Sequence, residues 1–171
     1  PNAMQLAGPN PPQQVARSLT AGQYAAQVGL PFNMDSWDGY PAARARLLST
    51  AQRNGVDLVA LSGDSHNAWA NDLMNDGRPA GVEFAGQSVT SPGIEASIPA
   101  PPAQVAQALQ QANPNLRFAD TARRGYMQVT LNALEAVCEW RFTNPVTTRS
   151  NQLAATVRAR TPALQRRLQL G

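Results

Sequence analysis

The sequence predicts an α/β fold, and three observations support this prediction. Segment 41–55, PAARARLLSTAQRNG, has the composition of a helix and runs directly into the apolar segment 56–62, VDLVALS. A second strand-like segment and a second helix-like segment follow at 81–89 and 101–113. Two alternating segments then form a hairpin pattern over 124–142. Helices that alternate with strands are typical of layered α/β proteins.

The first helix and strand are marked at their ends. Pro41 suits the first turn of a helix, and Gly55 suits the position just past its end. The run 56–62 is β-rich and almost wholly apolar, so we expect a strand that is covered on both faces.

The later elements follow the same logic. The strand GVEFAGQSV (81–89) is ended by the turn signal TSPG, and the helix PPAQVAQALQQAN (101–113) starts with proline and stops at NPN. RRGYMQVTLN and EAVCEWRFTN alternate apolar and polar residues around a short loop, which predicts an antiparallel hairpin.

The two ends of the chain carry weaker patterns within one expected domain, 1–171. The lead-in 1–32 is irregular, with one irregular helix expected between Gln14 and Val28. In the tail 145–171, ATVRAR predicts an edge strand. The tail arginines form either a basic patch for phosphate-bearing partners or, as we favour, a solvated face on that strand and a frayed last helix. They are Arg158, Arg160, Arg166 and Arg167.

Composition argues against two classes of protein. All 14 basic residues are arginines, the net charge is only +3, and no basic run is interleaved with aromatics, so there is no nucleic-acid motif. No apolar run approaches the ~20 residues that span a bilayer, so we expect no membrane span. There is no signal peptide, and the opening PNAMQLAGPNPPQQ is typical of an internal segment or a cloning remnant ahead of Met4.

Cys138 is the single cysteine, which rules out an intrachain disulfide. It lies in the alternating segment EAVCEWRF, where a small buried thiol fits. Core packing is therefore favoured over a reactive thiol.

The single histidine lies in LSGDSHNAW, residues 61–69. Asp64 and His66 follow the expected strand 56–62, and ligands of open α/β sheets bind outside the carboxyl ends of strands. Gly63 allows a sharp turn, so both side chains can aim at one point. An aspartate oxygen and a histidine nitrogen suit iron, manganese or zinc beside a harder ion. The pattern alone equally fits an Asx-type turn followed by a hydrogen-bonded histidine.

Residues before and after this motif have two interpretations. Trp37, Asp38 and Tyr40 line a cleft or, as we favour, anchor a loop in which Asp38 caps the helix that begins near Pro41. Three residues after the histidine are candidates for a substrate pocket or for holding the histidine loop. They are Asn67, Trp69 and Asn71, and Asp72 is a further residue that could line the cleft.

Two further positions are considered on the later strands. Glu83 is either a group that supports the site or an exposed edge residue. Arg124 and Tyr126 begin the hairpin and are expected to set its packing. No residue is assigned a catalytic role with certainty.

Four blocks together resemble the C-terminal half of the PhoD-type alkaline phosphatase/phosphodiesterase family, over roughly residues 30–142. They occur in family order, and no single block would suffice. They are NMDSWDGYPAARARLL (33–48), VDLVALSGDSHNAWANDL (56–73), GVEFAGQSVTSPG (81–93) and NLRFADTARRGYMQVTL (115–131).

This resemblance implies a fold and a chemistry. The fold is the C-terminal half of a metallophosphoesterase-like α/β sandwich with a β-hairpin in its second half. The resemblance implies hydrolysis of phosphomonoesters and phosphodiesters. It implies iron(III) and calcium as the metals, with other divalent metals as alternatives. Asp64 and His66 match the metal ligands of the family's Gly-Asp-x-His motif. The family is typically exported, often by the twin-arginine route, which implies a periplasmic or secreted bacterial protein.

The chain also departs from the family pattern. The family's other ligands lie on upstream motifs that this sequence lacks. They are a cysteine, a further aspartate with a nearby tyrosine, and an asparagine. Cys138 is not that cysteine. Two ligands do not complete a two-metal site, because each ion needs at least four donors. We therefore expect a fragment that is inactive alone, whose partner is the N-terminal half of the same protein. The alternative is a non-catalytic binding or structural α/β module. An exposed sheet edge would also favour a homo-oligomer of the fragment.

Overall fold

The computed structural model describes residues 35–143 and 145–171, together with scattered positions between 13 and 28. The helix expected between Gln14 and Val28 lies for the most part outside the described residues. None of the helices in the described part of the chain has the length and hydropathy needed to cross a bilayer.

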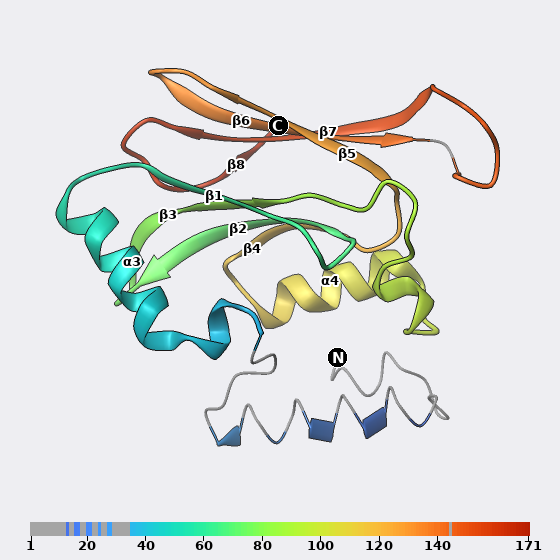
Figure 1. The fold of residues 1–171 in the computed structure, drawn as a ribbon, viewed down its shortest axis with the longest axis horizontal. Helices are drawn as coiled ribbons and strands as arrows, with labels where there is room; N and C mark the ends of the chain where they lie inside the picture. The colour runs from blue at the N-terminus through green and yellow to red at the C-terminus, as the bar shows by residue number, and fades with distance from the viewer. Residues whose placement is uncertain are drawn as a thin grey trace.

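Two four-stranded sheets stack face to face in the described part of the chain (Figure 1). The first sheet has the order β1-β3-β2-β4 and the second the order β5-β6-β7-β8. The strands of the first sheet are β1 (Leu58–Ser62), β2 (Ala68–Asn75), β3 (Arg78–Ala85) and β4 (Leu116–Asp120). Those of the second are β5 (Gly125–Leu131), β6 (Glu135–Thr143), β7 (Leu153–Pro162) and β8 (Gln169–Leu170).

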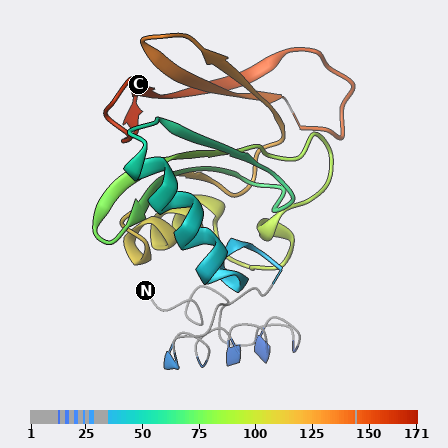
Figure 2. The ribbon, with the colours of Figure 1, turned by 60° about the vertical axis from the view of Figure 1, so that its left-hand side comes forward.

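Two helices, α3 (Pro41–Arg53) and α4 (Pro102–Ala112), cover the face of the first sheet that points away from the second (Figures 1 and 2). Two 3-10 turns, η1 (Trp37–Gly39) and η2 (Ile94–Ala96), precede them. The result is three layers, helices on sheet on sheet, which confirms the predicted α/β sandwich.

The core lies between the two sheets and centres on Trp140 of β6, which is fully buried. Its ring packs at 5.9 Å from the ring of Phe84 on β3 and at 4.9 Å from that of Phe118 on β4. Its Nε1–H donates a 2.8 Å hydrogen bond to the carbonyl of Ala85, so the indole has no unsatisfied polar atom. The remaining buried members of the core are Ala68, Ala70, Val82, Ala136, Cys138, Phe142, Ala159 and Leu168.

The strand directions bring three strand ends to one edge of the first sheet. β1 pairs with β3 in parallel, whereas β2 is antiparallel to both β3 and β4. β1, β3 and β4 therefore run the same way, and their carboxyl ends meet. This is the edge at which α/β sheets place their ligands.

The predicted helices and hairpin are confirmed with small shifts at their ends. The helix expected at 41–55 is α3, the one at 101–113 is α4, and the hairpin at 124–142 is β5–β6. The strand expected at 81–89 is β3, which starts three residues earlier, at Arg78, and ends at Ala85. Residues 86–93 belong to the loop that follows.

The expectation that 56–62 is a strand covered on both faces is wrong. β1 begins at Leu58 and pairs only with β3 among the described residues, so it is an edge strand. Leu61 is 57% exposed. An apolar run can line an edge as well as a centre, and its composition does not tell which strands lie beside it.

β2 and β4 were not predicted from the sequence. β2 buries the small residues Ala68 and Ala70 in the core, and the rest of the strand mixes polar and apolar side chains, which weakens the alternation that marks a strand. The hairpin β2–β3 did carry a signal, because its turn is Asp76-Gly77. Both residues have positive φ, 49° and 71°, as a type I′ hairpin turn requires.

The expected cap by Asp38 is also wrong. Helix α3 is preceded by Tyr40 at its N-cap, and no side chain caps it. Asp38 instead lies in the 3-10 turn η1, where it is exposed. WDGY forms the turn η1 and leads directly into Pro41 at the start of the helix, with Trp37 and Tyr40 more than half exposed.

The tail forms strands and turns instead of a frayed helix. β7 covers the predicted ATVRAR, but the expectation of an edge strand is wrong, because β7 pairs with β6 along its whole length and with the short β8 on its other side. The expected solvated face on the strand is confirmed, because Arg158 and Arg160 are about half exposed while they lie 3.8 and 3.3 Å from Glu135. Arg166 lies 3.4 Å from Asp57, and Arg167 lies 3.8 Å from Asp72.

Asp72 anchors this tail to the core. It is 4% exposed, and its Oδ1 accepts a 2.8 Å hydrogen bond from the backbone N–H of Leu168. The nearest guanidinium groups, of Arg117 and Arg167, are 3.7 and 3.8 Å away and about half exposed, so screening by solvent weakens them. The hydrogen bond to Leu168 is therefore the main contribution of Asp72.

Asp72→Ala should lower the free energy of unfolding by roughly 1–3 kcal/mol, because it leaves a buried N–H without an acceptor. Asp72→Asn keeps an oxygen at that position and should cost less. Chemical denaturation followed by circular dichroism measures both. The exposed Asp38→Ala variant is the control and should change stability by less than about 0.5 kcal/mol. Equal losses for the two Asp72 variants would contradict the assigned role of the hydrogen bond.

Cys138 lies in the core, as predicted. It is fully buried on β6, and burial, with a smaller contribution from Glu139, raises the pKa of its thiol to about 12. Because the thiolate is the reactive form, this thiol is unreactive at neutral pH.

The folded chain should therefore resist a thiol reagent at about pH 8, well below the raised pKa of about 12. The same chain in denaturant should react with one equivalent, since Cys138 is the single cysteine. Rapid labelling of the folded chain would show that the β5–β6–β7 sheet opens more readily than its packing indicates.

Candidate metal centre

The loop between β1 and β2 carries Asp64 and His66 at the shared carboxyl edge of the first sheet. Both residues have left-handed backbones, with φ of 65° and 59°. Such conformations cost about 1–3 kcal/mol each for residues other than glycine and tend to occur at functional sites. Gly63, in contrast, does not have a positive φ, so the sharp turn is made by Asp64 and His66 themselves.

Hydrogen bonds inside the loop hold this strained backbone. The N–H of Ser65 donates to the carbonyl of Gly63 at 2.7 Å. The hydroxyl of Ser65 accepts a 2.7 Å hydrogen bond from the indole Nε1–H of Trp69 on β2. Trp69 therefore holds the loop in place and is half-buried there.

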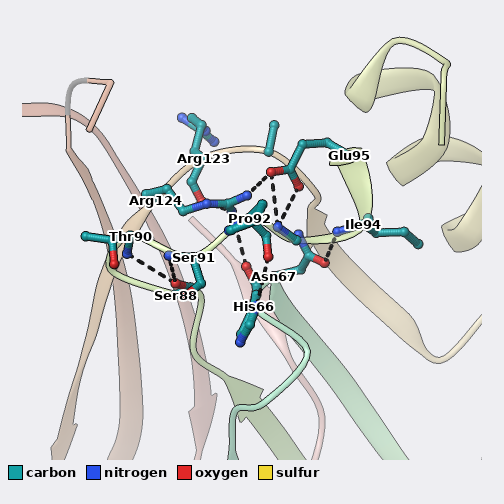
Figure 3. Close-up of polar contacts among 12 residues, drawn as sticks. His66, Asn67, Ser88, Thr90, Ser91, Pro92, Ile94, Glu95, Arg123 and Arg124 are labelled. Atoms are coloured by element: carbon teal, nitrogen blue, oxygen red, sulfur yellow. Dashed lines mark hydrogen bonds and ion pairs between the residues drawn. The ribbon is translucent and has the colours of Figure 1, made fainter. Parts of the chain in front are cut away.

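Asp64 is exposed, and its carboxylate has no hydrogen bond or ion pair to other side chains in the described part of the chain. Its oxygens are available to an ion. His66 is half-buried, and its Nδ1 lies 2.8 Å from the carbonyl oxygen of Pro92, in the loop after β3 (Figure 3). The second ring nitrogen is left for another partner. An acceptor oxygen and an acceptor nitrogen on one loop fit two ligands of a metal site.

The described residues do not complete such a site. Among them, no group of three or more His, Cys, Asp or Glu side chains gathers as a metal site would require. Asp64 and His66 thus fit two positions of a larger ligand set.

The three predicted pocket residues have different environments. Asn67 is 1% exposed, and its Oδ1 accepts a 3.1 Å hydrogen bond from the N–H of Ile94, whereas its Nδ2 has no partner. Asn71 is half-buried on β2 and donates a 2.9 Å hydrogen bond to Glu83. Trp69, as described above, reaches back to Ser65.

Glu83 lies in the central strand β3, so the alternative that it is an exposed edge residue is wrong. It accepts a 2.7 Å hydrogen bond from the hydroxyl of Ser62 in addition to that from Asn71. Glu83 therefore joins the end of β1 to β2, directly before the loop with Asp64.

The sequence predicts only hairpin packing for Arg124, but its side chain also reaches the histidine loop. It is 8% exposed, donates a 3.2 Å hydrogen bond from Nη1 to the carbonyl of His66, and pairs with Glu95 (Figure 3). Burial alone would raise the pKa of Glu95, but hydrogen bonds from Gly93 N–H and from Arg124 outweigh it and lower that pKa. Arg124 and Glu95 are 29 residues apart, and no local pattern links them.

Gly93 lies directly against Asn67. A Cβ at this glycine would lie 2.9 Å from both Cγ and Oδ1 of Asn67, and closer still to its Nδ2. Because Asn67 is buried and already bonded to Ile94, its side chain has little room to move. The absence of a side chain at residue 93 is what lets the two loops touch.

Gly93→Ala should therefore destabilise the chain by roughly 1–3 kcal/mol through overpacking. The penalty should shrink in an Asn67→Ala background, where the obstructing amide is gone, and a double-mutant cycle by urea unfolding measures this coupling. Gly63→Ala is the matched control, because a Cβ there meets nothing within 4 Å. Equal penalties in both backgrounds would contradict the predicted clash.

The geometry thus defines an α/β sandwich that presents an aspartate and a histidine on a loop at the carboxyl edge of its first sheet. The family model of the PhoD-like phosphatases matches residues 7–140, and the chain belongs to this family. The expected resemblance over roughly 30–142 is confirmed, and the match extends further towards the N-terminus.

Two relatives extend this comparison. Alkaline phosphatase D of Bacillus subtilis (strain 168) is 34% identical over 116 residues, which cover 64% of this chain and 19% of that protein. A solved structure described as "Structure of PhoD" superposes on this chain with a TM-score of 0.62 at 23% sequence identity. The superposition covers 80% of this chain and 26% of the solved chain, and it shows that the two folds are alike. The chain therefore spans about a fifth of the curated relative and about a quarter of the solved one.

Proposed function

We propose that this chain is the C-terminal part of a metal-dependent hydrolase of phosphomonoesters and phosphodiesters, in which Asp64 and His66 are metal ligands. The observation that carries the proposal is the pair itself: two acceptor side chains, on left-handed residues, at the carboxyl edge of the sheet. Membership of the PhoD-like phosphatase family supports the substrate class.

The ions we propose are iron(III) and calcium, with other divalent metals as alternatives. A carboxylate and an imidazole suit this mixture, because calcium prefers oxygen and iron accepts nitrogen. When bound, such ions lower the pKa of a water and offset the charge of the phosphoryl oxygens. The remaining ligands are proposed to come from upstream parts of the same protein, which in the relatives is several times longer than this chain.

The chain's own residues would shape and hold the site. Trp69 and Asn71, both half-buried on β2, remain the proposed pocket residues. The burial of Asn67 and its bond to Ile94 support a role in holding the histidine loop. We also propose, from the family, a periplasmic or secreted bacterial protein.

The proposal predicts that metal uptake depends on both ligands once the upstream half of a PhoD-like relative is supplied. His66→Ala should remove hydrolysis of a nitrophenyl phosphate ester, and Asp64→Asn should weaken metal retention at least tenfold, because a neutral amide is a poorer ligand. Elemental analysis after gel filtration and the rate of ester hydrolysis are the measurements. Asp38→Asn, exposed and in η1, is the matched control.

A second candidate function is a non-catalytic module, which the lack of a third acidic or histidine ligand among the described residues favours. A thermal melt separates the two, since an ion that binds only the folded state raises its stability. A chelator should lower the melting temperature of the joined protein if our proposal is correct. An unchanged melting temperature, with no bound metal, would support the module.

A further inference from the structure

The hydrogen bond of His66 defines which of its ring nitrogens carries the proton. Nδ1 lies 2.8 Å from the carbonyl oxygen of Pro92, and a carbonyl only accepts hydrogen bonds. Nδ1 must therefore donate, and in the neutral ring Nε2 keeps its lone pair. Figure 3 shows this second nitrogen pointing away from the loop of Pro92.

The carbonyl that orients His66 belongs to a peptide unit that is held from its other side. The peptide between Pro92 and Gly93 is planar, so its C=O and its N–H point in opposite directions. The Gly93 N–H donates to both carboxylate oxygens of Glu95, at 3.1 Å each. Glu95 thereby orients the peptide plane, and with it the acceptor of His66.

Arg124 joins this carboxylate to the histidine loop. Its Nη2 pairs with Oε1 of Glu95, and its Nη1 donates to the backbone carbonyl of His66 at 3.2 Å. The Arg124 side chain is 8% exposed and that of Glu95 25%, so the pair is largely shielded from solvent on the arginine side. One cation thus holds the backbone of the histidine and the group that orients the histidine ring.

We propose that Glu95 and Arg124 are positioning residues, which hold the Pro92–Gly93 peptide so that His66 stays in its Nδ1–H form with Nε2 free. The use of Nε2 as a metal ligand rests on the function proposed above. The tautomer itself does not, because it follows from contacts within this chain. Outer groups that orient a histidine ligand typically change metal affinity by roughly 10–100-fold when they are removed.

The test uses the fact that this chain has a single histidine. Nitrogen-15 NMR of the metal-free chain, at an alkaline pH above which the imidazole signals no longer change, reports the ratio of the two neutral tautomers, and a single histidine needs no residue assignment. We expect the Nδ1–H form to predominate. Glu95→Ala and Arg124→Met should each lower the ratio of Nδ1–H to Nε2–H by roughly fivefold, the factor that corresponds to one hydrogen bond.

The matched control is Arg123→Met, the neighbouring arginine. Arg123 pairs with Asp120 at 2.6 Å and stacks at 3.9 Å from the Phe142 ring centre, but it makes no side-chain bond to the histidine loop. Its loss should leave the tautomer ratio unchanged. Circular dichroism melts show that each variant folds, and Glu95→Gln, which keeps an oxygen for the Gly93 N–H, should restore most of the ratio.

Two outcomes would overturn the proposal. The first is a predominant Nε2–H form in the unmodified chain, and the second is an unchanged ratio in folded Glu95→Ala and Arg124→Met. Failure of the proposed hydrolase function would show instead as absent metal uptake in the joined protein. That failure would leave the tautomer ratio of the metal-free chain as we predict it.

Discussion

The structure depends on the burial of Trp140 between its two sheets. An indole removes a large apolar surface from water but must also satisfy its N–H, which few core positions allow. Here the N–H reaches the carbonyl of Ala85, the last residue of β3, while the ring packs against Phe84 and Phe118. The two sheets are therefore fixed relative to each other at the end of β3, where the chain enters the loop that orients His66.

This arrangement explains how a residue of the second sheet serves a loop of the first. After β4 the chain crosses from one sheet to the other within residues 121–124 and begins β5 at Gly125. Arg124 lies at this crossing, and its own carbonyl accepts from the N–H of Thr143 at the end of β6. The backbone of Arg124 is thus fixed by the second sheet, and its side chain is free to reach the loops at the edge of the first.

The sequence was informative where a signal is local. Pro41 and Pro102 mark the two helices, alternation marks the β5–β6 hairpin, and Gly-Asp-x-His marks the candidate ligands. It was not informative where a feature depends on partners distant in the chain. The edge position of β1 follows from sheet order, and the Glu95–Arg124 pair joins residues that no periodicity relates. Asp38 shows that a local signal can also mislead. An aspartate is a good helix cap, but Asp38 does not cap α3, because it lies in the turn η1 that already leads into the helix.

The left-handed backbones of Asp64 and His66 indicate a loop whose shape is held by the protein. Each such residue costs free energy, and the structure offsets this cost with contacts on both sides of the loop. Trp69 holds the hydroxyl of Ser65, whereas the carbonyl of His66 accepts from Ser88 N–H at 3.4 Å as well as from Arg124. These contacts need no ion. The two candidate ligands are therefore presented by the fold in advance, so a metal that binds here would find their backbone already ordered and would not have to supply that ordering energy.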